Sequence, residues 1–114
     1  MRKMLKSKLH RARVTESNLE YEGSCAIDQD LMDLAGIVPY EMVMICNLNN
    51  GERFDTYVIP GKRGSGEVSL NGAAARKGIA GDKIIIFSFR YVHDEELKEY
   101  NPKIVVLTDE NRPK

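Results

Sequence analysis

Apolar and polar residues alternate over several short segments of this chain, and that period of two predicts a fold built mainly of β-strands. Residues 4–15 form the first predicted strand. One of its faces is expected to carry Lys6, Lys8, His10, Ala12 and Val14. Taken alone, this segment favours a solvated basic edge strand.

The middle of the chain predicts a hairpin. Residues 40–48 are mostly apolar, which is typical of a strand buried on both faces. Asn49, Asn50 and Gly51 then favour a tight turn, and residues 52–59 form the return strand. Alternation along that strand places Arg53 and Tyr57 on one face and Thr56 on the other.

Three more strands and three short helical segments complete the prediction. The strands are expected at residues 67–70, 84–89 and 104–107. A helix is expected between Asp28, a good N-cap, and Gly36, which suits the left-handed C-terminal position. Shorter helical turns are expected at 73–77 and 94–100, and residues 109–114 should fray.

The chain contains an internal echo. Residues 36–44 align without gaps on residues 78–86, and each copy follows a helical segment and enters a buried strand. Two related halves that close into a small barrel would leave no open sheet edge.

Composition narrows the class of protein. The 114 residues suit one domain, and the 17 basic residues balance the 17 acidic ones, so neither a nucleic acid nor a membrane is expected as a partner. The chain has no apolar run of about 18 residues and no signal peptide, which favours the cytoplasm. Cys25 and Cys46 are expected to be free thiols, and the cysteines and histidines show no metal-binding spacing.

Two stretches could carry chemistry. In Tyr21-Glu22-Gly23-Ser24-Cys25 the Ser24 hydroxyl lies next to the Gly23 carbonyl, which it could attack, although a Gly-Ser pair in most proteins is only a turn. The small side chains of residues 71–75 would let a ligand approach the backbone closely, or would simply form a turn.

Read together and in order, these motifs resemble the pyruvoyl-dependent aspartate decarboxylases over residues 1–108. The motifs are Lys8-Leu9-His10-Arg11, Tyr21 to Asp28, Asn50-Gly51, Arg53 with Thr56-Tyr57, Asn71-Gly72-Ala73-Ala74-Ala75 and Gly81-Asp82. The resemblance implies a small closed double-psi β-barrel with short helices. It also implies a cytoplasmic homotetramer with active sites between subunits, which converts L-aspartate to β-alanine and CO₂ for pantothenate biosynthesis.

The resemblance further implies that the protein cleaves itself. The Ser24 hydroxyl attacks the Gly23 carbonyl, and the barrel domain of residues 1–114 is cut into a β-chain, 1–23, and an α-chain, 24–114. Ser24 becomes a covalently bound pyruvoyl group that forms a Schiff base with the substrate. Thr56 is expected to assist by stabilising the oxyanion at Gly23.

Other roles follow from the same resemblance. Tyr57 would be the proton donor, and Lys8 and Arg53 would bind the substrate carboxylates. Residues expected to line the substrate are Thr56, Asn71, Gly72, Ala73 and Ala74. His10 and Tyr21 are expected near the site, without an assigned role.

Two alternative functions compete with this one. A non-catalytic double-psi barrel could serve as a binding or assembly module, since a fold does not fix a function. A decarboxylase that uses pyridoxal phosphate would need a phosphate-binding loop, and the glycines at 61, 64 and 66 do not form one, so neither that cofactor nor a metal is expected.

Overall fold

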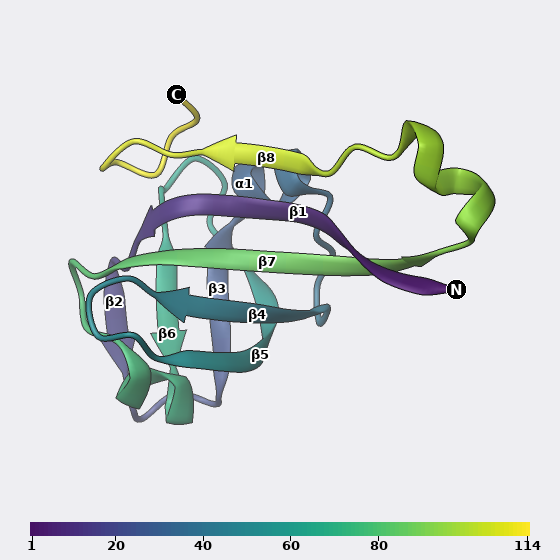
Figure 1. Ribbon diagram of the computed structural model, residues 1–114. Coiled ribbons are helices and arrows are strands. Elements are labelled where there is room, and N and C mark those ends of the chain that lie inside the picture. Colours follow the sequence, from purple (N-terminus) through teal and green to yellow (C-terminus); the bar gives the residue numbers. More distant parts are fainter.

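Eight strands form one mixed sheet, which a computed structural model describes over residues 1–114 (Figure 1). The strands lie in the order β2-β6-β3-β5-β4-β7-β1-β8. Their bounds are β1 Arg2–Arg13, β2 Glu16–Asn18, β3 Ser24–Asp28, β4 Met42–Asn47, β5 Arg53–Gly61, β6 Val68–Asn71, β7 Lys83–Val92 and β8 Lys103–Val106. The helical segments are α1 Gln29–Ala35 and the 3₁₀ helices η1 Gly72–Lys77 and η2 Asp94–Glu99.

The order of the strands shows that the sheet is rolled into a barrel. β1 and β2 follow each other in the chain, yet β2 is the first strand of the sheet and β1 is the seventh. The short link between them is held by backbone bonds from Val14 to Asp82 and from Thr15 to Val68. Side chains such as Leu9, Ile45 and Ile86 fill the interior without exposure. The prediction of a small, mainly β barrel is confirmed.

The first strand corrects the predicted faces. Arg11 has a φ of 66°, and the pairing of β1 with β7 shifts register between His10 and Ala12. A bulge of this kind adds one residue to the strand and reverses the side on which later residues lie. Ala12 and Val14 are therefore buried in the barrel with Leu9. The prediction that they lie on the same face as Lys8 is wrong.

The central hairpin is present, with two differences from the prediction. In β4 only alternate residues, Val43, Ile45 and Asn47, are buried, so the strand covers the core with one face. The loop between β4 and β5 spans five residues, and the Asn47 side chain accepts a hydrogen bond from the Asn49 backbone N–H within it. Of the turn residues Asn49, Asn50 and Gly51, only Gly51 has a positive φ, so the turn is not the tight one expected.

The internal echo is a real structural repeat, but its register differs by one residue from the gapless alignment. Tyr40 and Glu41 exchange backbone hydrogen bonds with Val58, just as Gly81 and Asp82 do with Val14. The side-chain carboxylates of Glu41 and Asp82 each accept a further hydrogen bond from the backbone N–H of the residue three positions earlier. Glu41 therefore corresponds to Asp82, and the two-fold relation passes between β4 and β7, where Ile45 lies opposite Ile86.

The C-terminal residues are held against the barrel, so the predicted fraying is wrong. Asn111 is buried, and its side chain bonds with the backbone of Arg13 and Gly66. Arg112 donates to the buried carboxylate of Asp28, the N-cap of α1. Burial acts to raise the pKa of Asp28, but hydrogen bonds from Gly66, Asp30, Gly64 and Arg112 outweigh it and lower that pKa.

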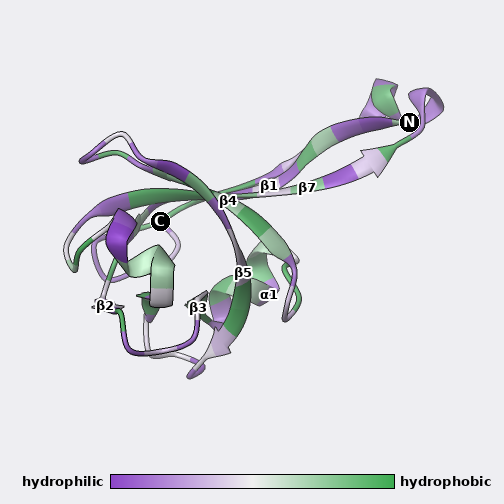
Figure 2. Ribbon diagram, turned by 90° about the horizontal axis from the view of Figure 1, so that it is seen from below, coloured by the Kyte–Doolittle hydropathy of each residue, from purple (hydrophilic) through white to green (hydrophobic).

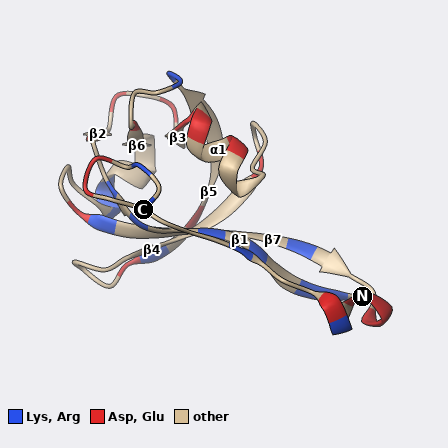
Figure 3. Ribbon diagram, turned by 90° about the horizontal axis from the view of Figure 1, so that it is seen from above, with Lys and Arg blue, Asp and Glu red and all other residues tan.

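A two-stranded arm projects from the barrel. Figure 2 shows β1 and β7 continuing together beyond the other strands, with η2 near the N-terminus at the tip. Basic residues lie along the arm and acidic residues gather near its tip (Figure 3). The molecule accordingly measures 45 × 27 × 25 Å. None of its helices has the length and apolar character needed to cross a lipid bilayer.

Candidate active site

The Gly23–Ser24 peptide lies where β3 begins. Ser24 pairs with Asn71 of β6 on one side, and Cys25 pairs with Val58 of β5 on the other. Because β3 and β5 run parallel, stepping back two residues along each strand brings Gly23 level with Thr56. The register of the sheet thus places the predicted cleavage point beside the residue expected to assist it.

Ser24 is only 2% exposed, and its hydroxyl has weak local partners. Its oxygen lies 3.4 Å from the Glu22 carbonyl and 3.4 Å from the amide nitrogen of Asn71, which donates to it. Both distances are long for hydrogen bonds, so neither partner holds the hydroxyl firmly. The buried amide oxygen of Asn71 has no partner at all. The site therefore contains a loosely held nucleophile next to an unsatisfied acceptor.

Gly72 allows the backbone to pass close to the junction. Its φ is +62°, and a Cβ atom at this position would lie 2.5 Å from both the nitrogen and the Cα of Gly23. The same atom would lie 2.8 Å from the carbonyl oxygen of Tyr21. Only glycine fits here, because both the left-handed φ and the contact exclude a side chain.

A pocket of about 350 Å³ opens beside this junction. Its walls come from β5, from η1 and from the residue that precedes β3. The lining residues are Gly23, Phe54, Asp55, Thr56, Tyr57, Ala73, Ala74 and Lys77. Two larger hollows, of about 660 and 530 Å³, do not include Gly23, so the smaller pocket is the candidate site.

Strand β5 reaches this pocket with both of its faces. Its alternation is as predicted, with Thr56 and Val58 more buried than Arg53 and Tyr57. Pairing with β3 begins only at Val58, so no strand of this chain pairs with that edge of β5 before it. Thr56 and Tyr57 can therefore both line one pocket although they belong to opposite faces. The Tyr57 ring, 37% exposed, lies 6.2 Å from the ring of Tyr40.

Two predicted residues lie elsewhere. Lys8 and His10 are on β1, which is separated from β5 by β4 and β7. At the usual strand spacing this places them roughly 14 Å from β5 within the chain. Burial, and then the charges of Lys8 and Arg11, lower the pKa of His10, whose Nδ1 atom is buried without a partner. One chain alone does not bring these side chains to the pocket.

Arg53 and Tyr21 lie at the edge of the site. Arg53 is on the same face of β5 as Tyr57 but four residues earlier, and its Nε donates to the Cys46 sulfur at 3.3 Å. Tyr21 is exposed, and its backbone oxygen faces Gly72. Next to Ser24, burial and then Glu67 raise the pKa of the Cys25 thiol to about 12, which makes this thiol a poor nucleophile.

Three lining residues were not predicted: Phe54, Asp55 and Lys77. Lys77 follows Ala74 by three residues in η1, and side chains at that spacing eclipse each other in a 3₁₀ helix. The predicted helical turn at 73–77 could have identified it. No cluster of three or more histidine, cysteine, aspartate or glutamate residues is arranged to hold a metal ion.

Comparison with known proteins identifies relatives along the whole chain. The aspartate decarboxylase family matches residues 1–114. A Ralstonia nicotianae protein named aspartate 1-decarboxylase is 58% identical over 113 residues, 99% of this chain and 94% of the relative. Proteins with the same name from Leptospira biflexa and Bacillus subtilis are 56% and 55% identical, over 96% and 97% of this chain and 93% and 87% of their own lengths.

Proposed function

This chain belongs to the aspartate decarboxylase family and is an enzyme that decarboxylates L-aspartate, and we propose that it does so with a pyruvoyl group made from its own Ser24. The observation that carries the proposal is the position of the Gly23–Ser24 peptide. It begins β3 at the wall of the pocket that Thr56 and Tyr57 also line. The product, β-alanine, would enter pantothenate biosynthesis.

Self-cleavage would proceed in three steps at the Gly23–Ser24 peptide: an acyl shift, an elimination and a hydrolysis. The Ser24 oxygen attacks the Gly23 carbonyl, the C–N bond breaks, and an ester replaces the amide. β-Elimination then releases the Gly23 carboxylate, which ends the chain 1–23, and leaves dehydroalanine at position 24. Water converts that residue to the pyruvoyl group and ammonia. Thr56, level with Gly23 on the neighbouring strand, is suited to stabilise the oxyanion of the first step.

The surroundings of Ser24 fit a pyruvoyl group. The group would supply an electron sink for the electrons left when CO₂ departs. Around it, the small side chains of Ala73 and Ala74 line the pocket, Gly72 lets the backbone pass close to Gly23, and Asn71 offers a buried, unpaired amide oxygen to an N–H donor. Tyr57 would deliver the proton that replaces the lost carboxylate.

Lys8, Arg53 and a homotetramer complete the proposal. Lys8 is separated from the pocket of its own chain by β4 and β7, so a neighbouring subunit would supply it. The projecting arm offers a surface for such contact, since Tyr91 on β7 is 62% exposed and Met42, the first residue of β4, is 65% exposed. Arg53 would bind one substrate carboxylate with its planar guanidinium group.

Cys25 and Cys46 do not form a disulfide, and free thiols of this kind support a cytoplasmic location.

Intact-mass measurement tests the proposal. The purified wild type, 12.9 kDa before cleavage, should separate into fragments 1–23 and 24–114, with the larger one blocked at its first residue. Ser24→Ala should remain uncut, folded and inactive. An uncleaved wild type that releases CO₂ from aspartate would refute the proposed cofactor. An uncleaved wild type without activity would instead favour a non-catalytic barrel.

A further inference from the structure

Lys77 is the cation that the structure places in the pocket beside the cleavage point. Of the eight lining residues, Lys77 is the only cation and Asp55 is the only carboxylate. The substrate brings two further carboxylates, so a pocket with Asp55 in its wall needs compensating positive charge. Neither Lys8 nor Arg53 lines this pocket within the chain.

The backbone of Lys77 is held in place from two directions. Its carbonyl accepts hydrogen bonds from the side-chain amides of Asn47, at 3.0 Å, and Asn50, at 2.9 Å. Both donors belong to the end of β4 and its hairpin loop, and Asn47 is buried. The 3₁₀ geometry of η1 then directs Lys77 to the side of Ala74, which also lines the pocket.

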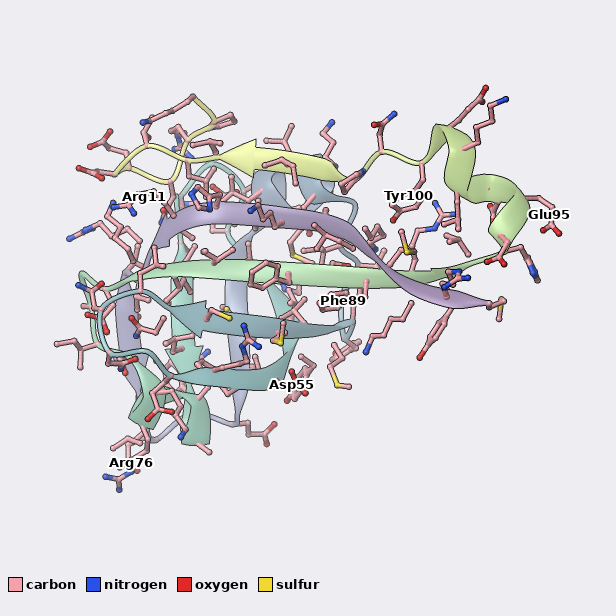
Figure 4. The ribbon with its side chains drawn as sticks, in the orientation of Figure 1. Arg11, Asp55, Arg76, Phe89, Glu95 and Tyr100 are labelled. Carbon is pink, nitrogen blue, oxygen red and sulfur yellow. The ribbon has the colours of Figure 1, made fainter.

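The ammonium group of Lys77 can leave its present partner. Its Nζ lies 3.0 Å from the Glu52 carboxylate, and the two side chains are 42% and 44% exposed. An ion pair with that much solvent contributes little to stability, so a substrate carboxylate in the pocket can compete for the ammonium. The neighbouring Arg76 does not line the pocket and projects outward from the end of the molecule (Figure 4).

We infer that Lys77 binds the carboxylate that the substrate keeps, and so helps to select a dicarboxylic amino acid. A cation that held the departing carboxylate would resist its conversion to neutral CO₂, because the attraction would be lost in the transition state. Binding of the retained carboxylate is equally strong before and during the reaction. The inference rests on the proposed function, because it assumes that the substrate reacts at residue 24.

Steady-state kinetics with L-aspartate test this role. Lys77→Met should raise KM about tenfold and leave kcat within about threefold, since one charge-assisted contact to the substrate is removed uniformly. Lys77→Arg should restore most of the affinity, because it returns the charge. Arg76→Met, which removes the adjacent cation of the same helix, is the matched control and should leave both constants unchanged.

All rates are expressed per cleaved subunit, as measured by intact mass, so that a processing defect is not read as weak binding. If Lys77→Met does not fold, Lys77→Gln takes its place, because glutamine keeps a polar side chain without the charge. An unchanged KM in a folded, cleaved variant, or a fall in kcat alone, would overturn the inference. Wild-type protein that is never cut would refute the proposed function instead, so the two failures can be told apart.

Discussion

Tyr57 and Thr56 are neighbours in sequence, yet they lie on opposite faces of β5 and line the same pocket. The free edge of the strand before Val58 makes this possible. The two side chains can therefore act at different stages of the chemistry, with Thr56 at cleavage and Tyr57 at turnover. A separation of this kind can be measured with single substitutions.

Tyr57→Phe removes a hydroxyl and keeps the ring beside Tyr40. Cleavage should proceed, because the proton transfer proposed for Tyr57 follows formation of the pyruvoyl group. The kcat should fall by about 10²- to 10⁴-fold, the usual contribution of a positioned proton donor. Intact mass reports the cleavage and β-alanine formation reports the turnover. A variant that stays uncut, or one that keeps its full rate once cut, would contradict the assignment.

Five of the eight residues that line the pocket belong to the predicted site, whereas other predicted residues, such as Asn71 and Gly72, do not line it. Gly23, Thr56, Tyr57 and Ala74 were expected together, and the pocket contains them all. Lys77 was not predicted, because its place in the pocket depends on the 3₁₀ geometry of η1, which aligns its side chain with that of Ala74. The positions of Lys8 and His10 relative to the pocket depend on strand order, which no local pattern specifies.

The loop of residues 36–41, which carries Tyr40 towards Tyr57, depends on one carboxylate. Glu41 accepts bonds from Ser88 and from Lys6, whose Nζ also donates to the Gly36 carbonyl at 2.8 Å. Tyr40 itself has a φ of 71°, unusual for a bulky residue, so the loop must be held by its surroundings. Burial acts to raise the pKa of Glu41, but the hydrogen bonds from Ser88 and Lys6 outweigh it and lower that pKa.

Glu41→Gln should therefore destabilise the protein in a pH-dependent way. A lowered folded pKa means that the carboxylate contributes its full stability above about pH 4.5, the ordinary value, and loses it as the pH falls through the folded pKa. At pH 7 the variant should lose about 1–3 kcal/mol of unfolding free energy. The gap to wild type should narrow below pH 4.5 in denaturant titrations.

Glu95→Gln serves as the control for this experiment. Glu95 is exposed on η2 and projects from the tip of the arm (Figure 4). Its substitution should leave the unfolding free energy nearly unchanged at every pH. A constant gap between wild type and Glu41→Gln from pH 7 down to pH 3 would mean that the titration of Glu41 does not stabilise the loop.

Six of the eight strands and the caps of α1 were predicted, because each depends on local chemistry, whereas β2 and β3 were not predicted. Asp28 is the N-cap of α1 and Gly36 is its C-cap, as expected. The errors fall where distant contacts decide. No residue pattern revealed the bulge at Arg11, which turns Ala12 inward, and nothing local indicated that Asn111 would be buried against Arg13 and Gly66.

Within one chain Lys8 is separated from the pocket by β4 and β7, and subunit mixing tests the proposal that a neighbouring chain supplies it. Lys8→Ala and Ser24→Ala should each be inactive alone. Coexpressed in equal amounts, they should regain about a quarter of wild-type activity, because each proposed site takes Ser24 from one chain and Lys8 from a symmetry-related neighbour. Activity of the mixed, purified oligomers gives the result, and no recovery would place both residues in one chain.

The first 23 residues join the two sides of the barrel, since β2 is the first strand of the sheet and β1, which precedes it in the chain, is the seventh. Cutting after Gly23 would turn that segment into a separate peptide. Backbone hydrogen bonds to β7, β8 and β6 would hold it, together with the buried side chains of Leu9, Ala12 and Val14 and the bond from Lys6 to Glu41. The mature enzyme would then be a two-piece assembly whose unfolding releases a free strand. Recovery of the folded enzyme after denaturation would therefore require reassociation of the peptide 1–23 with the fragment 24–114, and it would depend on protein concentration.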